Sequence, residues 1–260
     1  MCKGGTSLFF NLFGSGKQEQ IEEYAGKMAK AAIEDELDAD MLEELIAFAK
    51  EKGLGNKQLA KAQALACDKA FEALYHDGYM DDDEYGLFAD LLKLCYMMKE
   101  AEKYKYETIS RRCNALFKIQ EKGLLPKMDK EYANVKYRPG EELYFTSAAR
   151  FMTPAKPVKR EDSIIIAPGK PFKVGGWENH EDKSAWKEGE KGAFWMTSER
   201  LGFRSKEKKE TIELSDLESA EIGQGPLCLY EKGKDATLAV AIDDYEMVGA
   251  ILSNLMNPEK

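Results

Sequence analysis

The residues best placed to bind a metal ion form one acidic stretch, HDGYMDDDEY, at residues 76–85. Its Asp-Gly pair and its last Glu have the spacing of the middle and end of an EF-hand calcium loop. If Gly78 is the sixth loop position, however, Ala73 is the first and a tyrosine is the third, so two oxygen ligands of a hard cation are absent. We therefore expect Gly78 to end a helix, Asp81 to cap the next helix and Glu84 to complete that cap.

Residues for nucleophilic catalysis and for nucleotide binding are scarce. The chain has two histidines, His76 and His180, and no Gly-x-Ser-x-Gly elbow accompanies them. The stretch GSGK is similar to the end of a phosphate-binding loop, but Asn11 stands where the first glycine belongs and Gln18 replaces the required Ser or Thr. We predict no catalytic residue, no cofactor and no metal site.

The composition limits the classes of partner and the compartment. A net charge of -9 opposes general attraction to nucleic acid, which depends on clustered Lys and Arg. No stretch has the length of a membrane-spanning helix or the pattern of a signal peptide, so we expect a cytoplasmic protein, with membrane association left open. We expect reduced, mostly buried thiols, because no C-x-x-C pair occurs among the five cysteines Cys2, Cys67, Cys95, Cys113 and Cys228.

The first 17 residues concentrate apolar side chains in a segment too short to span a bilayer. Such a segment could lie in a membrane interface, insert into a partner groove or dock on its own helical domain, and these alternatives remain open. The candidate contact residues for a membrane or a partner are Leu8, Phe9, Phe10, Leu12 and Phe13.

Two further stretches could contact a ligand. Lys156, Lys159 and Arg160 cluster on an early loop of the second half and are candidates for binding an anion or a lipid head group, although a solvated loop is the favoured interpretation. Trp177 and Trp186 flank an acidic loop, where large aromatic side chains contact a ligand or, more often, anchor the loop to its core.

The elements that must position these residues divide the chain into two halves. From Gln18 to about Lys130 the apolar residues recur at helical spacing and predict five helices with short connections, hence a compact bundle. We expect Asp40 to cap the second helix, Gly53 to end it, and Gly123 to end the fifth. The apolar stripes of the first two helices are predicted at Ile21, Tyr24, Ala25, Met28 and Ala32, and at Leu42, Leu45, Ile46 and Ala49.

The second half has the pattern of a sheet. Alternating residues after the Pro-Gly turn at 139–140 predict a first strand, and many short strands separated by turn residues follow, which argues for an antiparallel barrel or sandwich. One of these predicted strands is Pro171 to Val174. A closing helix should begin at Asp243 or Asp244 and bury Tyr245, Val248, Ile251, Leu252 and Leu255.

Sequence motifs in this half resemble those of bacterial PH-like and GRAM-like domains. GAFWMTSERLGFRS is similar to a Gly-strand-Thr-x-x-Arg-Leu-x-Phe signature, and GEELYFTSAARF and ETIELSDLESAEIG resemble the strands before and after it. The resemblance implies a small barrel whose open end is plugged by the closing helix. The matching positions are Gly140, Glu141, Phe145, Thr146, Gly192, Thr197, Arg200, Leu201, Phe203, Leu214, Asp216 and Leu217.

The helical half resembles TerB-like and SHOCT-type bundles over about residues 60–98, through the helix, Asp-Gly-x-Met turn, acidic cap and helix. TerB-like proteins carry further acidic metal-site residues that this sequence lacks, so the resemblance implies no metal site here. The predicted organisation is an apolar tail at 1–17, a helical bundle at 18–132, a linker at 133–140 and a PH-like β domain at 141–260.

The predicted fold class is therefore α+β: an N-terminal helical bundle followed by a PH-like antiparallel β-barrel closed by a C-terminal helix. We expect a nonenzymatic, bacterial-type adaptor or membrane-proximal module that recognises a protein or an anionic head group. The alternative is a metal-dependent regulator or enzyme with a site in the acidic helical half, around Asp77, Asp81 and Glu84.

Overall fold

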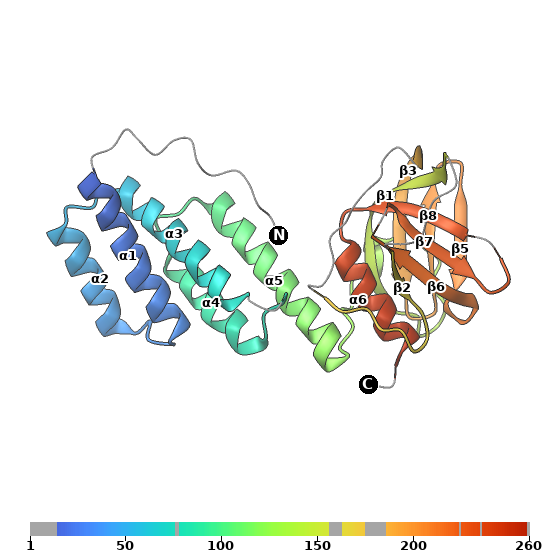
Figure 1. The fold of residues 1–260 in the computed structure, drawn as a ribbon, viewed down its shortest axis with the longest axis horizontal. Coiled ribbons are helices and arrows are strands. Elements are labelled where there is room, and N and C mark those ends of the chain that lie inside the picture. The colour runs from blue at the N-terminus through green and yellow to red at the C-terminus, as the bar shows by residue number, and fades with distance from the viewer. Residues whose placement is uncertain are drawn as a thin grey trace. The chain divides into compact units, whose positions relative to one another are not determined.

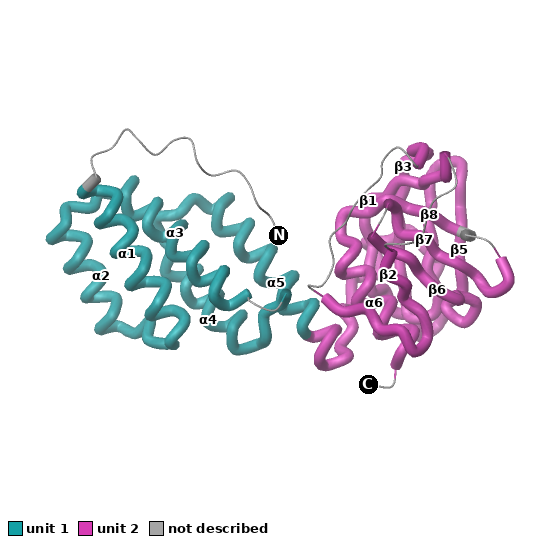
Figure 2. Tube along the Cα trace, viewed as in Figure 1, with its two compact units in different colours: residues 1–117 teal, residues 118–260 magenta. Residues whose placement is uncertain are grey.

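The chain forms two compact units, residues 1–117 and residues 118–260 (Figure 2). The boundary between them falls inside the longest helix. The structure is a computed structural model, and it describes residues 15–75, 78–155, 163–174, 186–223, 225–234 and 236–258.

The first unit is helical, as the periodicity predicts. Its helices are α1 (Ser15–Ile33), α2 (Ala39–Glu51), α3 (Asn56–Leu74), α4 (Asp82–Leu94) and α5 (Glu100–Lys122), the last of which continues into the second unit (Figure 1). The predicted stripe of α1 is confirmed, because all five of its residues are buried. The stripe of α2 is narrower than predicted, since Ile46 is 47% exposed. This helix packs chiefly against α1, and one neighbour covers only one side of a helix.

Local hydrogen bonds fix the ends of these helices. The predicted capping box at α4 is confirmed: Asp81 Oδ1 accepts from the Glu84 amide at 2.7 Å, and Glu84 Oε2 accepts from the Asp81 amide at 2.8 Å. The predicted cap of α2 is wrong by two residues, because Asp38, and not Asp40, accepts from an amide of the first turn. Gly53 has a φ of 60°, the left-handed conformation that ends a helix.

The second unit is an antiparallel sheet with one helix. Strand β1 pairs with β3 along its whole length but with β8 only over Ala149 to Phe151. The eight strands lie in the order β2-β6-β7-β8-β1-β3-β4-β5. Their bounds are β1 Leu143–Pro154, β2 Ile164–Ile166, β3 Trp186–Thr197, β4 Arg200–Ser205, β5 Lys209–Glu213, β6 Leu217–Ile222, β7 Leu227–Glu231 and β8 Ala236–Ile242.

The predicted closure of this sheet into a barrel is wrong. Strands β2 and β5 are the two edges, and no described strand joins them. The predicted strand Pro171 to Val174 does not form either. Two of its amides bond to side chains: Phe172 donates to Ser253 Oγ at 2.8 Å and Val174 donates to Gln120 Oε1 at 3.4 Å.

Helix α6 (Tyr245–Met256) packs on β2 and β6 and covers part of the core. Asp244, one of the two predicted caps, accepts from the Met247 amide at 3.0 Å. The predicted apolar stripe is buried except for Leu255, which is half-buried. The largest fully buried side chains of this unit include Leu143, Ile166, Phe172, Phe194 and Phe203.

The residues between α5 and β1 pack on the sheet of the second unit. Met128 forms an isolated bridge with Leu143, and Ala133 is buried with Leu143 and Trp195. Arg204 Nη1 donates to the carbonyl of Asn134 at 2.8 Å. Part of the stretch predicted as a linker, 133–140, therefore contributes to a small apolar cluster over β3.

Candidate functional site

The predicted binding residues fall in two stretches outside the described residues. The apolar tail and the basic loop therefore stay predictions, and they concern Leu8, Phe9, Phe10, Leu12, Phe13, Lys156, Lys159 and Arg160.

Two of the carboxylates in the acidic turn of the helical unit, Asp81 and Glu84, form a helix cap. Asp81 and Glu84 bond to each other's amides, and Asp82 Oδ1 accepts from Asn114 Nδ2 at 2.9 Å. Asp77 lies outside the described residues. Within the described ranges, no group of three or more His, Cys, Asp or Glu side chains is arranged to hold a metal ion. These contacts favour a structural role for this turn.

Three residues of the PH-like motifs meet in one buried network in the second unit. Glu141, which comes from the segment before β1, is fully buried. Its Oε1 accepts from Arg200 Nε at 2.9 Å and from Thr197 Oγ1 at 2.6 Å, and its Oε2 accepts from Arg200 Nη2 at 3.0 Å. Arg200 Nη2 also donates to the carbonyl of Lys136 at 2.6 Å. The network ties the chain before β1 to the β3–β4 hairpin.

The charge of Glu141 is stabilised by this network. Burial alone would raise the pKa of the carboxyl group, but hydrogen bonds from Arg200, from Thr197 and from the Arg138 amide lower that pKa to about 2. A carboxylate with all of these donors is a structural group, because no free lone pair points toward solvent where a substrate could lie. The motif residues thus hold the fold together rather than form a reaction centre.

A groove of about 490 Å³ lies beside the part of β1 that pairs with both β3 and β8. This volume is within the range of ligand pockets. The β1–β3 groove is lined by Ala148, Ala149, Arg150 and Met152 of β1, Trp186, Glu188, Lys191 and Gly192 of β3, Gly225 and Pro226 before β7, and Ala241, Ile242, Asp243 and Tyr245.

Two cations lie opposite each other in this groove. Arg150 and Lys191 are direct partners across β1 and β3, and directly opposite residues of an antiparallel pair project from the same face. Arg150 Nη1 bonds to Glu188 at 3.0 Å. Lys191 is exposed and has no ion pair with any described residue. Among the described residues, the groove therefore holds an ammonium group without an ion pair beside a paired guanidinium group.

The floor of the groove is apolar and includes an unused donor. Met152 and Trp186 pack on a small buried cluster of Cys228, Tyr230 and Ala239. The buried Trp186 Nε1 has no hydrogen-bond partner among the described residues. A Cβ at Gly225 would lie 2.5 Å from that nitrogen, so only glycine lets the indole occupy this position.

The sequence predicts a possible ligand contact for one residue of the groove. That residue is Trp186, whose type suits either a ligand contact or a loop anchor, and in the structure it lines the groove. Arg150, Met152 and Lys191 have no local signal, because they become neighbours only through the pairing of β1 with β3. Knowledge of that register would have been needed to bring residues 150 and 191 together.

Comparisons with known proteins assign no family to the chain. No protein-family model matches it, and a search of curated proteins finds no match. The resemblances to PH-like, GRAM-like, TerB-like and SHOCT-type domains therefore remain predictions that rest on sequence motifs. In the part of the chain that the structure describes, no helix is long and apolar enough to cross a membrane.

Proposed function

We propose that this chain is a nonenzymatic adaptor whose second unit binds an extended segment of a partner protein in the β1–β3 groove. The observation that carries the proposal is the position of Arg150 and Lys191 opposite each other, beside the apolar floor of Met152 and Trp186. Like charges directly across a strand pair repel, so an acidic group bound between them relieves an unfavourable interaction. An apolar side chain of the same segment would cover the floor.

The charges of the groove favour a polypeptide over a lipid head group. Glu188 and Asp243 also line it, so its two cations are matched by two acids. An anionic membrane surface attracts clustered Lys and Arg, whereas a groove with both signs of charge complements a segment that carries both. We therefore take a protein as the ligand, and the membrane as the alternative that an experiment must separate.

We also infer that the second unit is an open variant of the PH-like fold. Antiparallel strands followed by a single closing helix support this inference, as does the network of Glu141, Thr197 and Arg200 at the matching motif positions. In this proposal the apolar tail at 1–17 and the basic loop at Lys156 to Arg160 would add weak contacts to a partner or to a cytoplasmic membrane face.

The proposal is tested by selecting peptides from a display library on the full chain and measuring their affinity by fluorescence anisotropy. Lys191→Glu should weaken selected peptides that place an acidic side chain between Arg150 and Lys191 by about tenfold or more, because a charged hydrogen bond is lost and a repulsion replaces it. Lys187→Glu is the matched control, since Lys187 is exposed on the same strand but does not line the groove. Its affinity should match that of the unmodified chain.

Co-sedimentation with neutral and anionic vesicles separates the two kinds of ligand. If no peptide is selected and Lys191→Glu abolishes binding to anionic vesicles, the groove is a head-group site and the proposal is wrong. If removal of residues 1–17 abolishes vesicle binding while Lys191→Glu leaves it unchanged, the membrane contact belongs to the tail, and the groove remains available for a peptide.

A further inference from the structure

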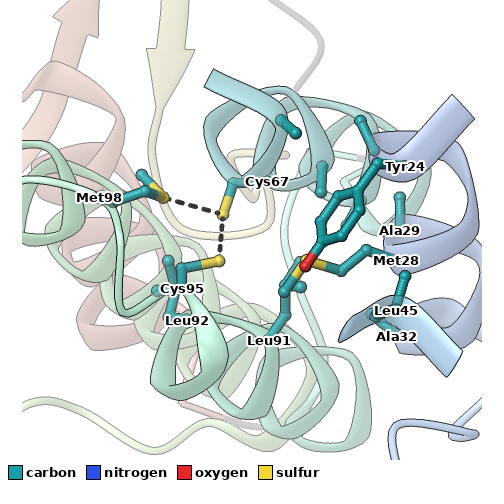
Figure 3. Close-up of a cluster of buried hydrophobic side chains, with 14 of the residues drawn as sticks. Tyr24, Met28, Ala29, Ala32, Leu45, Cys67, Leu91, Leu92, Cys95 and Met98 are labelled. Carbon is teal, nitrogen blue, oxygen red and sulfur yellow. Dashed lines mark hydrogen bonds between the residues drawn. The ribbon is translucent and has the colours of Figure 1, made fainter. Parts of the chain in front are cut away.

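Three sulfur atoms meet in the core of the helical unit (Figure 3). The proposed adaptor function uses none of them. Cys67 Sγ lies 3.5 Å from Cys95 Sγ and 3.8 Å from Met98 Sδ. We call Cys67, Cys95 and Met98 the sulfur cluster. The two thiols are fully buried and Met98 is 4% exposed.

Two helices and the turn after the second of them bring these sulfurs together. Cys67 is on α3, Cys95 caps the end of α4, and Met98 is in the turn that leads to α5. Gln63 of α3 holds this turn, because its Oε1 accepts from the Met97 amide at 2.8 Å and its Nε2 donates to the Leu94 carbonyl at 3.4 Å. The turn is thus fixed over α3, and the sulfurs are held without a covalent bond.

We propose that the sulfur cluster is a binding site for a single copper(I) ion, with two thiolates and one thioether as ligands. Thiolate and thioether sulfurs are the soft ligands that select copper(I). A metal bonded to three sulfurs at about 2.3 Å in a plane requires sulfurs about 4.0 Å apart. The two distances from Cys67 fall within about 0.5 Å of that value, so small rotations of the side chains would complete the site.

The set of ligands argues against zinc, the other common metal at cysteine sites. Structural zinc takes four ligands from Cys, His, Asp and Glu. The described residues place no third side chain of these types with Cys67 and Cys95 in a metal-binding group, and the third neighbour is the thioether of Met98. A three-sulfur site in an apolar core suits a metal that accepts low coordination by soft atoms.

Binding releases protons, because copper(I) bonds to the thiolate form of a cysteine. The hydrogen bond with Cys95 and burial raise the pKa of the Cys67 thiol. Each thiol loses its proton when its sulfur bonds to copper(I), so two protons pass to solvent for each ion bound. The complex carries one net negative charge, which the ammonium group of Lys103 opposes at Cys67. The apparent affinity should therefore rise with pH.

The ion can enter through the turn between α4 and α5. Tyr96 in this turn is 61% exposed, although Cys95 and Met98 on either side of it are buried. Opening of a short turn is a local event that leaves the helices folded. Gln63 is then a positioning residue, because it restores the closed turn over the bound ion.

The test is anaerobic titration of the reduced full chain with copper(I) in competition with a coloured copper(I) chelator such as bicinchoninate. Cys2→Ser serves as the background, since Cys2 is outside the described residues. We expect one equivalent of tightly bound copper, a thiolate-to-copper charge-transfer band and a first shell of sulfur alone by X-ray absorption. Zinc at the same concentration should not displace the copper.

Variants separate the site from general thiol chemistry. Cys67→Ser and Cys95→Ser should each lose the tightly bound equivalent, and Met98→Leu, which keeps the apolar volume, should weaken binding by about tenfold or more. Cys228→Ser, in the other unit, and Met80→Leu, in the same core, are the matched controls and should bind as the background does. Circular dichroism establishes that each variant is folded.

Two results would overturn the proposal. One is that the background protein withdraws no copper from the chelator. The other is that Met98→Leu and the background bind with the same affinity, which would leave a two-cysteine contact without the third ligand.

Discussion

Glu141 is a fully buried carboxylate whose charge is stabilised by hydrogen bonds from three residues, Arg138, Thr197 and Arg200. Its partner Arg200 is also largely buried, and the guanidinium group lies 5.6 Å from the centroid of the Trp195 ring. A buried ion pair contributes little compared with an apolar pair of the same size, but removing one partner leaves the other charge without compensation. Removing one residue of the network should therefore destabilise the fold by more than the whole network stabilises it.

Replacing Glu141 with Gln should reduce the free energy of unfolding by about 3 kcal/mol at neutral pH. The folded protein holds the pKa of Glu141 near 2, below its usual value of 4.5, so this contribution is complete above pH 4.5 and is lost as the pH falls toward 2. Glu141→Gln should accordingly flatten the loss of stability across that interval. Urea unfolding followed by tryptophan fluorescence measures it, because all three tryptophans are in the second unit.

The matched control is Glu142→Gln, the next residue, which is half-buried and has no ion pair with a described residue. It should leave both the midpoint at neutral pH and the acid dependence nearly unchanged. Equal acid dependence in Glu141→Gln and in the unmodified chain would show that another group is responsible for the titration.

At the scale of elements, the cap of α4 should contribute measurably to the free energy of unfolding of the first unit. Asp81→Ala removes the acceptor of the Glu84 amide and should cost about 1 kcal/mol in the first unit. Asp83 is in the same first turn but is not part of the cap. Asp83→Ala therefore removes only a favourable charge at the helix start and should cost about 0.5 kcal/mol or less. Urea unfolding followed by far-ultraviolet circular dichroism compares them, and equal losses would contradict the capping role.

The sequence predicts such local features well and distant pairings poorly. The box at Asp81 and Glu84 depends on residues three apart, and the five helices depend on spacing within each segment. The failed strand at Pro171 to Val174 has a strand-like sequence, but its amides bond to Gln120 and Ser253, which no local pattern connects to it.

The same distinction applies to the sites. Cys67 and Cys95 are 28 residues apart and meet only when α3 packs on α4 and its following turn. Arg150 and Lys191 meet through the register of β1 with β3. Trp186 could be named from its residue type, because large aromatics beside a loop commonly anchor or contact something. Residue type thus predicts candidates, whereas the fold decides which of them become neighbours.

At the scale of the whole molecule, the predicted start of the second domain at 141 can be compared with the unit boundary at 118. A fragment of residues 118–260 should fold and show the blue-shifted emission maximum of buried tryptophan side chains. A fragment of residues 141–260 lacks Ala133, which covers Trp195, and Arg138, which bonds to Glu199 and Glu213. It should show a red-shifted emission maximum and a lower urea midpoint.

Emission spectra and urea midpoints of the two fragments decide between the boundaries. Identical spectra and midpoints would support a domain that begins at 141 and would make the preceding segment dispensable. The unmodified chain provides the reference for both fragments.

Helix α5 crosses the boundary between the units, and its end contributes to the second of them. Asn254 Nδ2 donates to the Ile119 carbonyl at 3.4 Å, and Gln120 accepts from the Val174 amide. Suppose that recombination between genes exchanges the β unit at the loop after α5. The exchanged unit would then lose Ile119 and Gln120, to which it bonds. We therefore expect an exchange of this unit between genes to give a folded product when the junction precedes Ile119, so that the end of α5 is inherited together with the sheet.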